Sequence, residues 1–351
     1  MKWKGAMLGL MVATGAAIGV AGCGAIQYYA QAVNGHLAVM AAAKPIDKSL
    51  LDEPSMAPTL KAKLERVLEI RSFAVSELKL PDNGSYRRYA DIGRPYVVWN
   101  VFAVEEFSLR PKESCFLFAG CIAYRGFYAE ADANAHADAL RAEGLDVLVY
   151  GVTAYSTLGW FDDPVLNTFI GHPEAELAKI IFHELAHQVV YTKDDSIFNE
   201  SFAVAVEEEG VRRWIARFGT DAQRQGYEAG RQRRAEFVAL IAKYQKLFGE
   251  AYATELALAA KRAEKARLFG ALRADYETMK RDSWGGFAGY DRWFAQDLNN
   301  AHLASIATYG DLVPAFRALL MKNNGDIAAF YRDAKALAER PKTERLKALG
   351  G

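Results

Sequence analysis

Apolar residues recur along the chain with two main spacings. In residues 23–80 they return every three or four positions, as at Leu60, Leu64 and Val67, which predicts N-terminal helices. Between residues 81 and 172, the runs 94–103, 116–124 and 147–152 are rich in β-branched and aromatic residues and predict strands. Residues 129–144 between them predict a helix that ends at a glycine. From residue 173 to the end of the chain, the helical spacing returns.

These patterns predict an α+β fold that is predominantly α. A small mixed β-sheet unit over residues 81–172 is followed by a helical region over residues 173–351, and residues 80–351 are expected to form one compact unit. Residues 221–282 are charged and rich in alanine, which predicts a long helical hairpin with a break near Phe248 and Gly249. Two final helices are expected to be separated near residues 323–325.

The first 22 residues differ from the rest of the chain. Lys2 and Lys4 precede an apolar stretch over residues 6–21, and small residues precede Cys23, as in a secretory signal peptide. The segment resembles a bacterial lipobox, which implies cleavage before Cys23 and lipidation of its thiol. We therefore predict a lipoprotein that is anchored to a membrane through Cys23 and faces the periplasm of a bacterial cell envelope. A plain signal peptide or an uncleaved anchor is the alternative.

The charge balance narrows the choice of partners. Lys plus Arg and Asp plus Glu both number 43, so the formal net charge is zero. A nucleic-acid-binding protein usually carries a basic excess, and we therefore expect no nucleic-acid partner.

Two cysteines remain once Cys23 is assigned to the lipid. Cys115 and Cys121 lie six positions apart, and export would place them in an oxidising compartment where a disulfide can form. Two buried thiols are the alternative, because geometry decides whether such a pair can close.

The clearest chemical signal is the segment His183-Glu184-Leu185-Ala186-His187. Residues four apart share one face of a helix, so both imidazoles can reach a single ion. Zinc suits imidazole and carboxylate ligands. Glu184 would lie beside the ion, where a general base for an attacking water is needed.

A third ligand follows from the next segment. Residues 192–196 predict a polar reversal and a second helix, which would return Glu200 to the two histidines. Two His, one Glu and an open fourth position are typical of a catalytic zinc site. We therefore predict one Zn²⁺ ion held by His183, His187 and Glu200. Glu207 lies on the same helix face as Glu200 and could orient a histidine, although a run of three glutamates is also typical of a solvated face.

The His-Glu-x-x-His segment at 183–187, followed by Asn-Glu-x-Phe-Ala at 199–203, resembles the aminopeptidase branch of the gluzincin metallopeptidases. With the segments at 120–127 and 154–164, the chain is similar to a family of bacterial lipoproteins predicted to be aminopeptidases. The resemblance implies a zincin-like catalytic region. Two features depart from the better-known gluzincins: only twelve residues separate His187 from Glu200, and the Gly-x-Met-Glu-Asn segment of the exopeptidase site is missing.

The same resemblance implies residues that contact the substrate. Residues 155–161 suit an edge strand that would pair with an extended substrate backbone, although an ordinary aromatic-rich loop is the alternative. Gluzincins commonly stabilise the oxyanion with a Tyr or His from a downstream helix. Tyr309 is the preferred candidate here, and Tyr290 and His302 are the others. The predicted substrate-binding residues are Ser156, Thr157, Leu158 and Gly159.

The sequence as a whole therefore predicts a zinc-dependent peptidase of the aminopeptidase type, which hydrolyses peptide substrates with Glu184 as general base. One alternative is an endopeptidase or another amide hydrolase on the same site. Another is a non-catalytic, zinc-stabilised, lipid-anchored envelope protein. The presence of Glu184 argues against the latter, because a structural zinc site needs no base.

Overall fold

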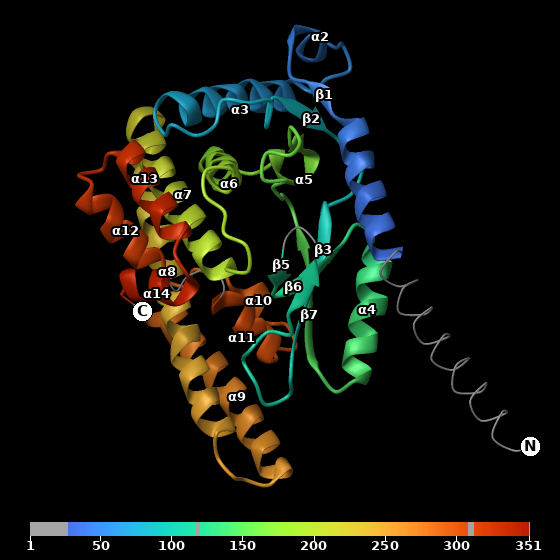
Figure 1. Cartoon of the computed structure of the whole chain (residues 1–351), viewed down its shortest axis with the longest axis vertical. Helices are drawn as coiled ribbons and strands as arrows, with labels where there is room; N and C mark the ends of the chain where they lie inside the picture. Colours follow the sequence, from blue (N-terminus) through green and yellow to red (C-terminus); the bar gives the residue numbers. More distant parts are fainter. Residues whose placement is uncertain (1–26, 117–119, 308–311, 351) are drawn as a thin grey trace, which may run out of the picture.

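The computed structural model describes residues 27–116, 120–307 and 312–350 (Figure 1). Helices account for 60% of the structure and strands for 10%, which confirms the predicted α+β class with a predominance of helix. Residues 27–42 are helical, whereas the predicted signal peptide and Cys23 lie outside the described residues. The further helices are α2 (Lys48–Leu51), α3 (Pro58–Ser76), α4 (Glu130–Ala142), α5 (Asn167–Ile170), α6 (Glu174–Ala186), α7 (Ser196–Phe218), α8 (Asp221–Tyr252), α9 (Leu258–Asp282), α10 (Asp291–Phe294), α11 (Asn300–Ala307), α12 (Val313–Lys322), α13 (Ile327–Ala338) and α14 (Lys342–Ala348).

The strands form three small sheets, with the orders β1-β2-β8, β6-β3-β7 and β4-β5. In the sheet that matters most for the site, β3 lies in the middle and runs antiparallel to both neighbours. The strands are β1 (Lys44–Pro45), β2 (Arg88–Ala90), β3 (Val98–Val104), β4 (Ser114–Phe116), β5 (Gly120–Ile122), β6 (Tyr124–Phe127), β7 (Asp146–Val152) and β8 (Val165–Leu166).

The two faces of the β6-β3-β7 sheet have different neighbours. Trp99, Val101 and Ala103 of β3 pack with Ala133 and other residues of α4 on one face. The residues between them point to the other face, because side chains alternate along a strand. On that second face, Phe102 and Val104 pack against Ala301 and Ala304 of α11. Because α11 covers only one end of this face, the remainder is available to line a cavity.

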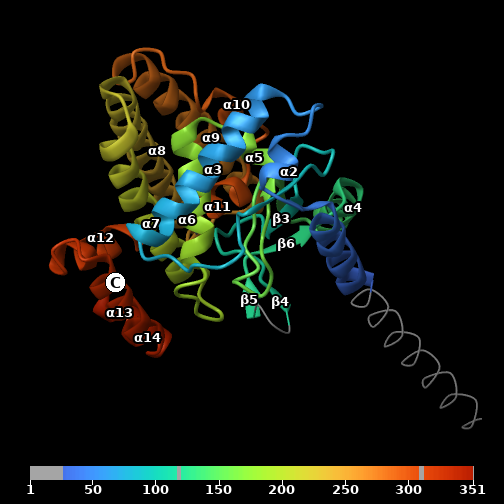
Figure 2. The same cartoon turned by 90° about the horizontal axis from the view of Figure 1, so that it is seen from above.

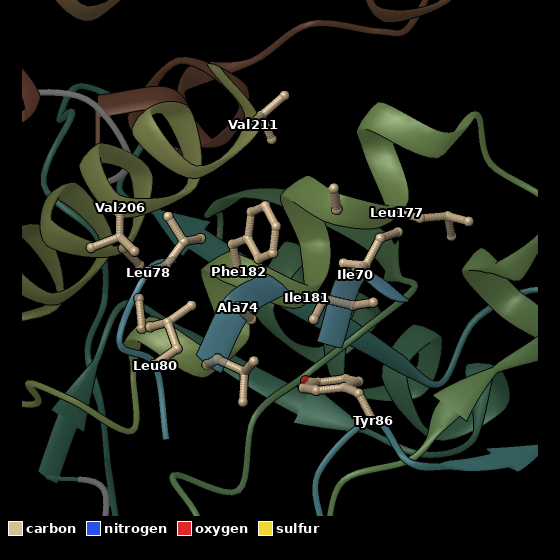
Figure 3. Close-up of a cluster of buried hydrophobic side chains, with 14 of the residues drawn as sticks. Ile70, Ala74, Leu78, Leu80, Tyr86, Leu177, Ile181, Phe182, Val206 and Val211 are labelled. Atoms are coloured by element: carbon tan, nitrogen blue, oxygen red, sulfur yellow. The ribbon is translucent and has the colours of Figure 1, made fainter. Parts of the chain in front are cut away.

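The antiparallel pair α6–α7 lies at the centre of the molecule, and α3 crosses it at one end (Figure 1). Figure 3 shows side chains of α3, α6 and α7 packed together, among them Ile70, Phe182 and Val206. Burial of a side chain such as Phe182 contributes about 1.5–3 kcal/mol. Gly210 lets the elements approach closely, because a Cβ there would lie 2.6 Å from Phe182 Cδ2 and 2.7 Å from Leu78 Cδ1.

Helices α8 and α9 form the predicted hairpin, which extends away from the N-terminal helix (Figures 1 and 2). The hairpin has a hydrophobic cluster of its own, to which α10 and α11 also contribute. The predicted break near Phe248 and Gly249 is wrong: α8 continues to Tyr252, and the connection spans residues 253–257. The helix persists because Phe248 is fully buried in the hairpin cluster, which outweighs the weak helix propensity of the following glycine.

Two other predicted strands and one predicted helix are present in the structure. The strand expected at 94–103 is β3, the one at 147–152 lies within β7, and the helix at 129–144 contains α4. The single strand expected at 116–124 is wrong, because the chain reverses between β4 and β5 and pairs Cys115 with Cys121. A disulfide joins these two cysteines. At the end of the chain, α12 and α13 separate near residues 323–325 as expected, and the shorter α14 follows them.

No helix within the described ranges has both the length and the apolar character that crossing a bilayer requires.

Candidate metal centre and active-site cavity

Helix α6 carries the His-Glu-x-x-His segment near its C-terminal end. One face of this helix is fully buried through Ala178, Ile181 and Leu185, as its apolar spacing predicts. The opposite face presents His183, and His187 stands at the C-cap position directly after the last helical residue. Both imidazoles therefore project from a helix end that the core holds in place.

The connection from α6 to α7 returns the chain toward the histidines. Asp195 caps α7, since its carboxylate accepts a hydrogen bond from the backbone N–H of Phe198. The Asn199 amide accepts from the N–H of Thr192 at 2.8 Å and donates to its carbonyl at 2.7 Å. This double contact fixes the reversal against the first turn of α7 and so positions Glu200, the next residue.

The ligand atoms of His183, His187 and Glu200 converge. The two Nε2 atoms of the histidines lie 3.2 Å apart. Glu200 Oε2 lies 3.3 Å from His183 Nε2, and Glu200 Oε1 lies 3.8 Å from His187 Nε2. A tetrahedral zinc ion with bonds of about 2.0–2.1 Å holds neighbouring ligand atoms about 3.4 Å apart. The donor set and its spacing therefore fit a metal ion, and among the described residues these three form the group that could hold one.

Glu207 supports this group from two turns further along α7. Its Oε2 lies 2.7 Å from His183 Nδ1, which leaves Nε2 of that ring directed at the other two ligands. A carboxylate in this place fixes the orientation and tautomer of a ligating histidine. The ring of His187 has no matching contact, because its buried Nδ1 lacks a hydrogen-bond partner within the described ranges.

The pKa values of His183 and His187 are shifted in opposite directions. Burial disfavours the charged form of His183, but hydrogen bonds with Glu200 and Glu207 outweigh it and raise its pKa well above the usual value. For His187, burial dominates and lowers the pKa to about 4. His187 is thus neutral near pH 7, which is the form that binds a metal ion.

The pKa values of Glu184 and Glu200 are also shifted in opposite directions. Burial raises the pKa of Glu184 to about 7; the His183 charge opposes this rise and the Glu200 charge adds to it. For Glu200, burial opposes ionisation, but interactions with His187 and His183 prevail and lower the pKa. Glu200 is therefore held as an anion suited to a metal, while Glu184 is poised to take up and release a proton.

A cavity of about 660 Å³ opens between the α6–α7 pair and the second face of the β6-β3-β7 sheet. His183, Glu184 and Glu200 line its helical side. Its sheet side includes Asn100, Tyr124 and Tyr150, which share one face because Tyr150 pairs with Asn100, and Tyr124 pairs with Phe102, across the strands. The continuation of β7 over residues 151–156 lines another wall.

The edge strand expected over residues 155–161 is wrong. This segment turns at Leu158 and Gly159, whose φ angles are 57° and 83°. The N–H of Thr157 donates to the Asp163 carboxylate at 2.9 Å, and the N–H of Leu158 donates to Ser156 Oγ at 3.1 Å. These backbone groups are occupied within the loop itself. Ser156 and Leu158 line the cavity, whereas Thr157 and Gly159 do not.

Of the three residues predicted to stabilise the oxyanion, two lie outside the cavity lining. Tyr290 stacks on Phe237 in the hairpin cluster, with ring centroids 4.4 Å apart, and does not line the cavity. His302 contacts Asn299 and Trp293 and is likewise outside the cavity lining. Tyr309 lies outside the described residues, so its role stays a prediction.

The structure adds Tyr124 of β6, to which the sequence assigned no role. Burial, followed by the charge of Glu200, holds the pKa of Tyr124 well above its usual range, and Glu184 acts in the same direction. Its hydroxyl therefore stays protonated in the presence of these two carboxylates. The segment 120–127 contributed to the family resemblance, but nothing in its spacing revealed that Tyr124 lines the same cavity as the histidines.

One of the three comparisons with known proteins identified a family. Neither the curated proteins nor the solved structures gave a match to this chain. A family model described as "Putative aminopeptidase" matches residues 27–349, which include both metal-centre helices and the cavity walls. Because this match extends over almost the whole described chain, the protein belongs to the family described as "Putative aminopeptidase".

Proposed function

We propose that this protein is a zinc-dependent peptidase, in which His183, His187 and Glu200 hold one zinc ion and Glu184 is the general base. One observation carries the proposal: the ligand atoms of three residues approach one another to 3.2–3.8 Å, and these residues lie beside Glu184 on the wall of a substrate-sized cavity. Family membership supports peptide substrates.

The donor set favours zinc among the common metal ions. Two imidazoles and one carboxylate suit Zn²⁺, whereas Mg²⁺ and Ca²⁺ prefer sites built from oxygen. A structural zinc site usually has four protein ligands, but three converge here among the residues that the structure describes, and the cavity leads to this group. This arrangement supports a catalytic rather than a structural ion.

Two side chains have direct roles in the proposed mechanism. When bound, zinc would supply Lewis acidity toward the substrate carbonyl and the attacking water. Glu184 accepts a proton from this water and later delivers it to the leaving amine. Tyr124 donates a hydrogen bond to the oxyanion that develops on the carbonyl oxygen, since its protonated hydroxyl shares the cavity with Glu184 and Glu200.

The substrate backbone is proposed to lie along residues 151–156. This segment continues β7, which is an edge strand of its sheet, and lines the cavity opposite α6. Extended peptides commonly add to such an edge through backbone hydrogen bonds. It takes the place of residues 155–161, which the sequence predicted for this purpose.

Action at the amino terminus of a peptide is the finer part of the proposal and follows from the family description. Cleavage of matched peptides with free and acetylated amino termini tests it. An aminopeptidase cleaves only the free form, whereas an endopeptidase on the same site cleaves both.

The function is tested with the full-length protein, a peptide library and the His183→Ala variant. We expect about one zinc ion per chain, peptide cleavage that stops on chelation and returns with zinc, and loss of both properties in the variant. Cleavage that continues after complete removal of metal would contradict a zinc peptidase. Zinc binding without cleavage of any peptide would favour the non-catalytic alternative.

We also propose that Cys23 carries a lipid that holds the protein on a membrane of the bacterial envelope. Support comes from the sequence around Cys23 alone. A Cys23→Ser variant tests the anchor: it should move from the membrane fraction to the soluble fraction, and an unchanged distribution would argue against lipidation.

A further inference from the structure

The charges that line the cavity are unevenly distributed. Its acidic side chains are Glu184, Glu200 and Glu207, and all three lie at the metal centre. Apart from the histidines, Lys179 is the cationic side chain among the described residues of the lining. Away from the metal centre, the charge that a substrate meets on these walls is therefore positive.

Lys179 occupies a defined position relative to the centre. It precedes His183 by four residues on α6, so the two share a helix face and both line the cavity. Four residues of helix correspond to a rise of about 6 Å. Lys179 therefore lines the cavity about one helical turn before the first ligand.

The ammonium group of Lys179 has only a weak protein partner. Its Nζ lies 3.5 Å from Glu176 Oε2, and the two side chains are 33% and 52% exposed. Ion pairs in such exposed positions contribute little, commonly 0–1 kcal/mol, so a substrate carboxylate competes easily for this lysine.

The three carboxylates of the lining are already engaged. Glu200 contacts both histidines, and Glu207 contacts Nδ1 of His183. Glu184 is the proposed base. A free substrate amine therefore meets no uncommitted carboxylate among the described lining residues, whereas a substrate carboxylate meets Lys179.

From this arrangement we propose that Lys179 is a specificity-determining residue that binds a carboxylate of the substrate. The carboxylate belongs either to the C-terminus of a short peptide or to an acidic side chain. The inference rests on the proposed peptidase function and defines its substrate class.

Binding measurements test the inference without depending on turnover. The full-length Glu184→Gln protein, loaded with zinc, is titrated with tetra-alanine, whose amino terminus is free, as the free acid and as the C-terminal amide. A partly exposed ion pair contributes up to about 1 kcal/mol, so we expect the free acid to bind up to about fivefold more tightly. A second series of amidated peptides, each with one Glu or Gln at successive positions, distinguishes a terminal carboxylate from an acidic side chain.

Three variants in the Glu184→Gln background assign the effect to Lys179. The preference should disappear in Lys179→Gln and persist in Lys179→Arg. It should also persist in Lys112→Gln, whose lysine pairs with Glu143 outside the cavity lining and serves as the matched control. Equal affinities for all acid and amide pairs, or a preference that survives Lys179→Gln, would overturn the inference.

Turnover by the wild-type protein separates this inference from the proposed function. If the acid form binds more tightly through Lys179 but no peptide is cleaved, the peptidase proposal fails and the binding site stands. If peptides are cleaved with no preference for a carboxylate, the peptidase proposal stands and the role of Lys179 is wrong.

Discussion

The molecule contains two long antiparallel helix pairs that place their charged side chains in opposite ways. In α6–α7, the side chains of His183, Glu200 and Glu207 are only 16%, 17% and 8% exposed, and His183 contacts both glutamates. In the α8–α9 hairpin, Lys243 pairs with Asp275 while the two side chains are 58% and 41% exposed. One pair thus collects polar groups inside the protein, and the other leaves them at the surface.

The contrast indicates which polar groups have a function. Burying charged groups costs free energy unless they are well paired, so a fold has no reason to gather several of them without a gain. The hairpin avoids this free-energy cost. An apolar stripe that includes Phe237, Ile241 and Phe248 lies inside, and the ion pairs lie outside. The free-energy cost of burying charged side chains in α6–α7 is explained if a metal ion binds between them.

The largest expected effect is the loss of the general base. Glu184→Gln should lower kcat by about 10³-fold while zinc remains bound, because a positioned acid–base group contributes about 10²–10⁴-fold. The matched control is Glu264→Gln on α9, which removes a surface partner of Arg267 and should leave kcat unchanged. Steady-state kinetics with metal analysis measure both. Undiminished turnover in Glu184→Gln would refute the assigned role.

Next in size is the removal of the Tyr124 hydroxyl. Tyr124→Phe should lower kcat by about 10²-fold with little change in KM or zinc content, since an oxyanion donor acts mainly in the transition state. Tyr244→Phe on α8, which removes a hydroxyl bonded to Asp275 at 2.9 Å, should leave kcat unchanged. If Tyr309→Phe produces the loss and Tyr124→Phe does not, the original sequence prediction is the better one.

A smaller effect is expected from the carboxylate behind the metal ligand. Glu207→Gln should weaken zinc affinity by about 10–100-fold, because this carboxylate orients His183. Glu236→Gln on α8, where the carboxylate accepts a hydrogen bond from the Trp284 indole, should leave the affinity unchanged. Competition with a chromogenic chelator measures both affinities, and equal values for Glu207→Gln and the wild type would exclude this support.

The smallest effect concerns the hairpin surface. Lys243→Ala should change the free energy of unfolding by less than about 1 kcal/mol, because both partners of its ion pair are exposed. Chemical denaturation measures the change. A loss of several kcal/mol would mean that the surface charges of the hairpin contribute more than the comparison allows.

Local spacing explains what the sequence could predict. The His pair and Glu200 belong to neighbouring helices joined by a short reversal, so helix periodicity and the polar residues at 192–196 suffice to bring them together. Lys179 obeys the same four-residue spacing from His183 and could have been found in this way. Helices with strong periodicity, such as the α8–α9 hairpin, were predictable for the same reason.

Two features could not be predicted from the sequence, because they depend on strand pairing between distant segments and on hydrogen bonds within a loop. Tyr124 reaches the centre from β6, about sixty residues earlier in the chain, through strand pairing that no local pattern encodes. At residues 155–161, the aromatic composition is typical of a strand, but the buried Asp163 carboxylate takes the N–H of Thr157 and bends the chain into a turn. Hydrogen bonds within the loop thus override a strand propensity worth at most about 1 kcal/mol.

The central claim is the convergence of three side chains on one ion. It is tested most directly by crystals of the full-length protein grown with zinc, with diffraction recorded on both sides of the zinc absorption edge. The account predicts one anomalous peak, about 2.0–2.2 Å from Nε2 of His183, Nε2 of His187 and a carboxylate oxygen of Glu200. A peak bound by other residues, or none at these three in zinc-saturated crystals, would contradict it.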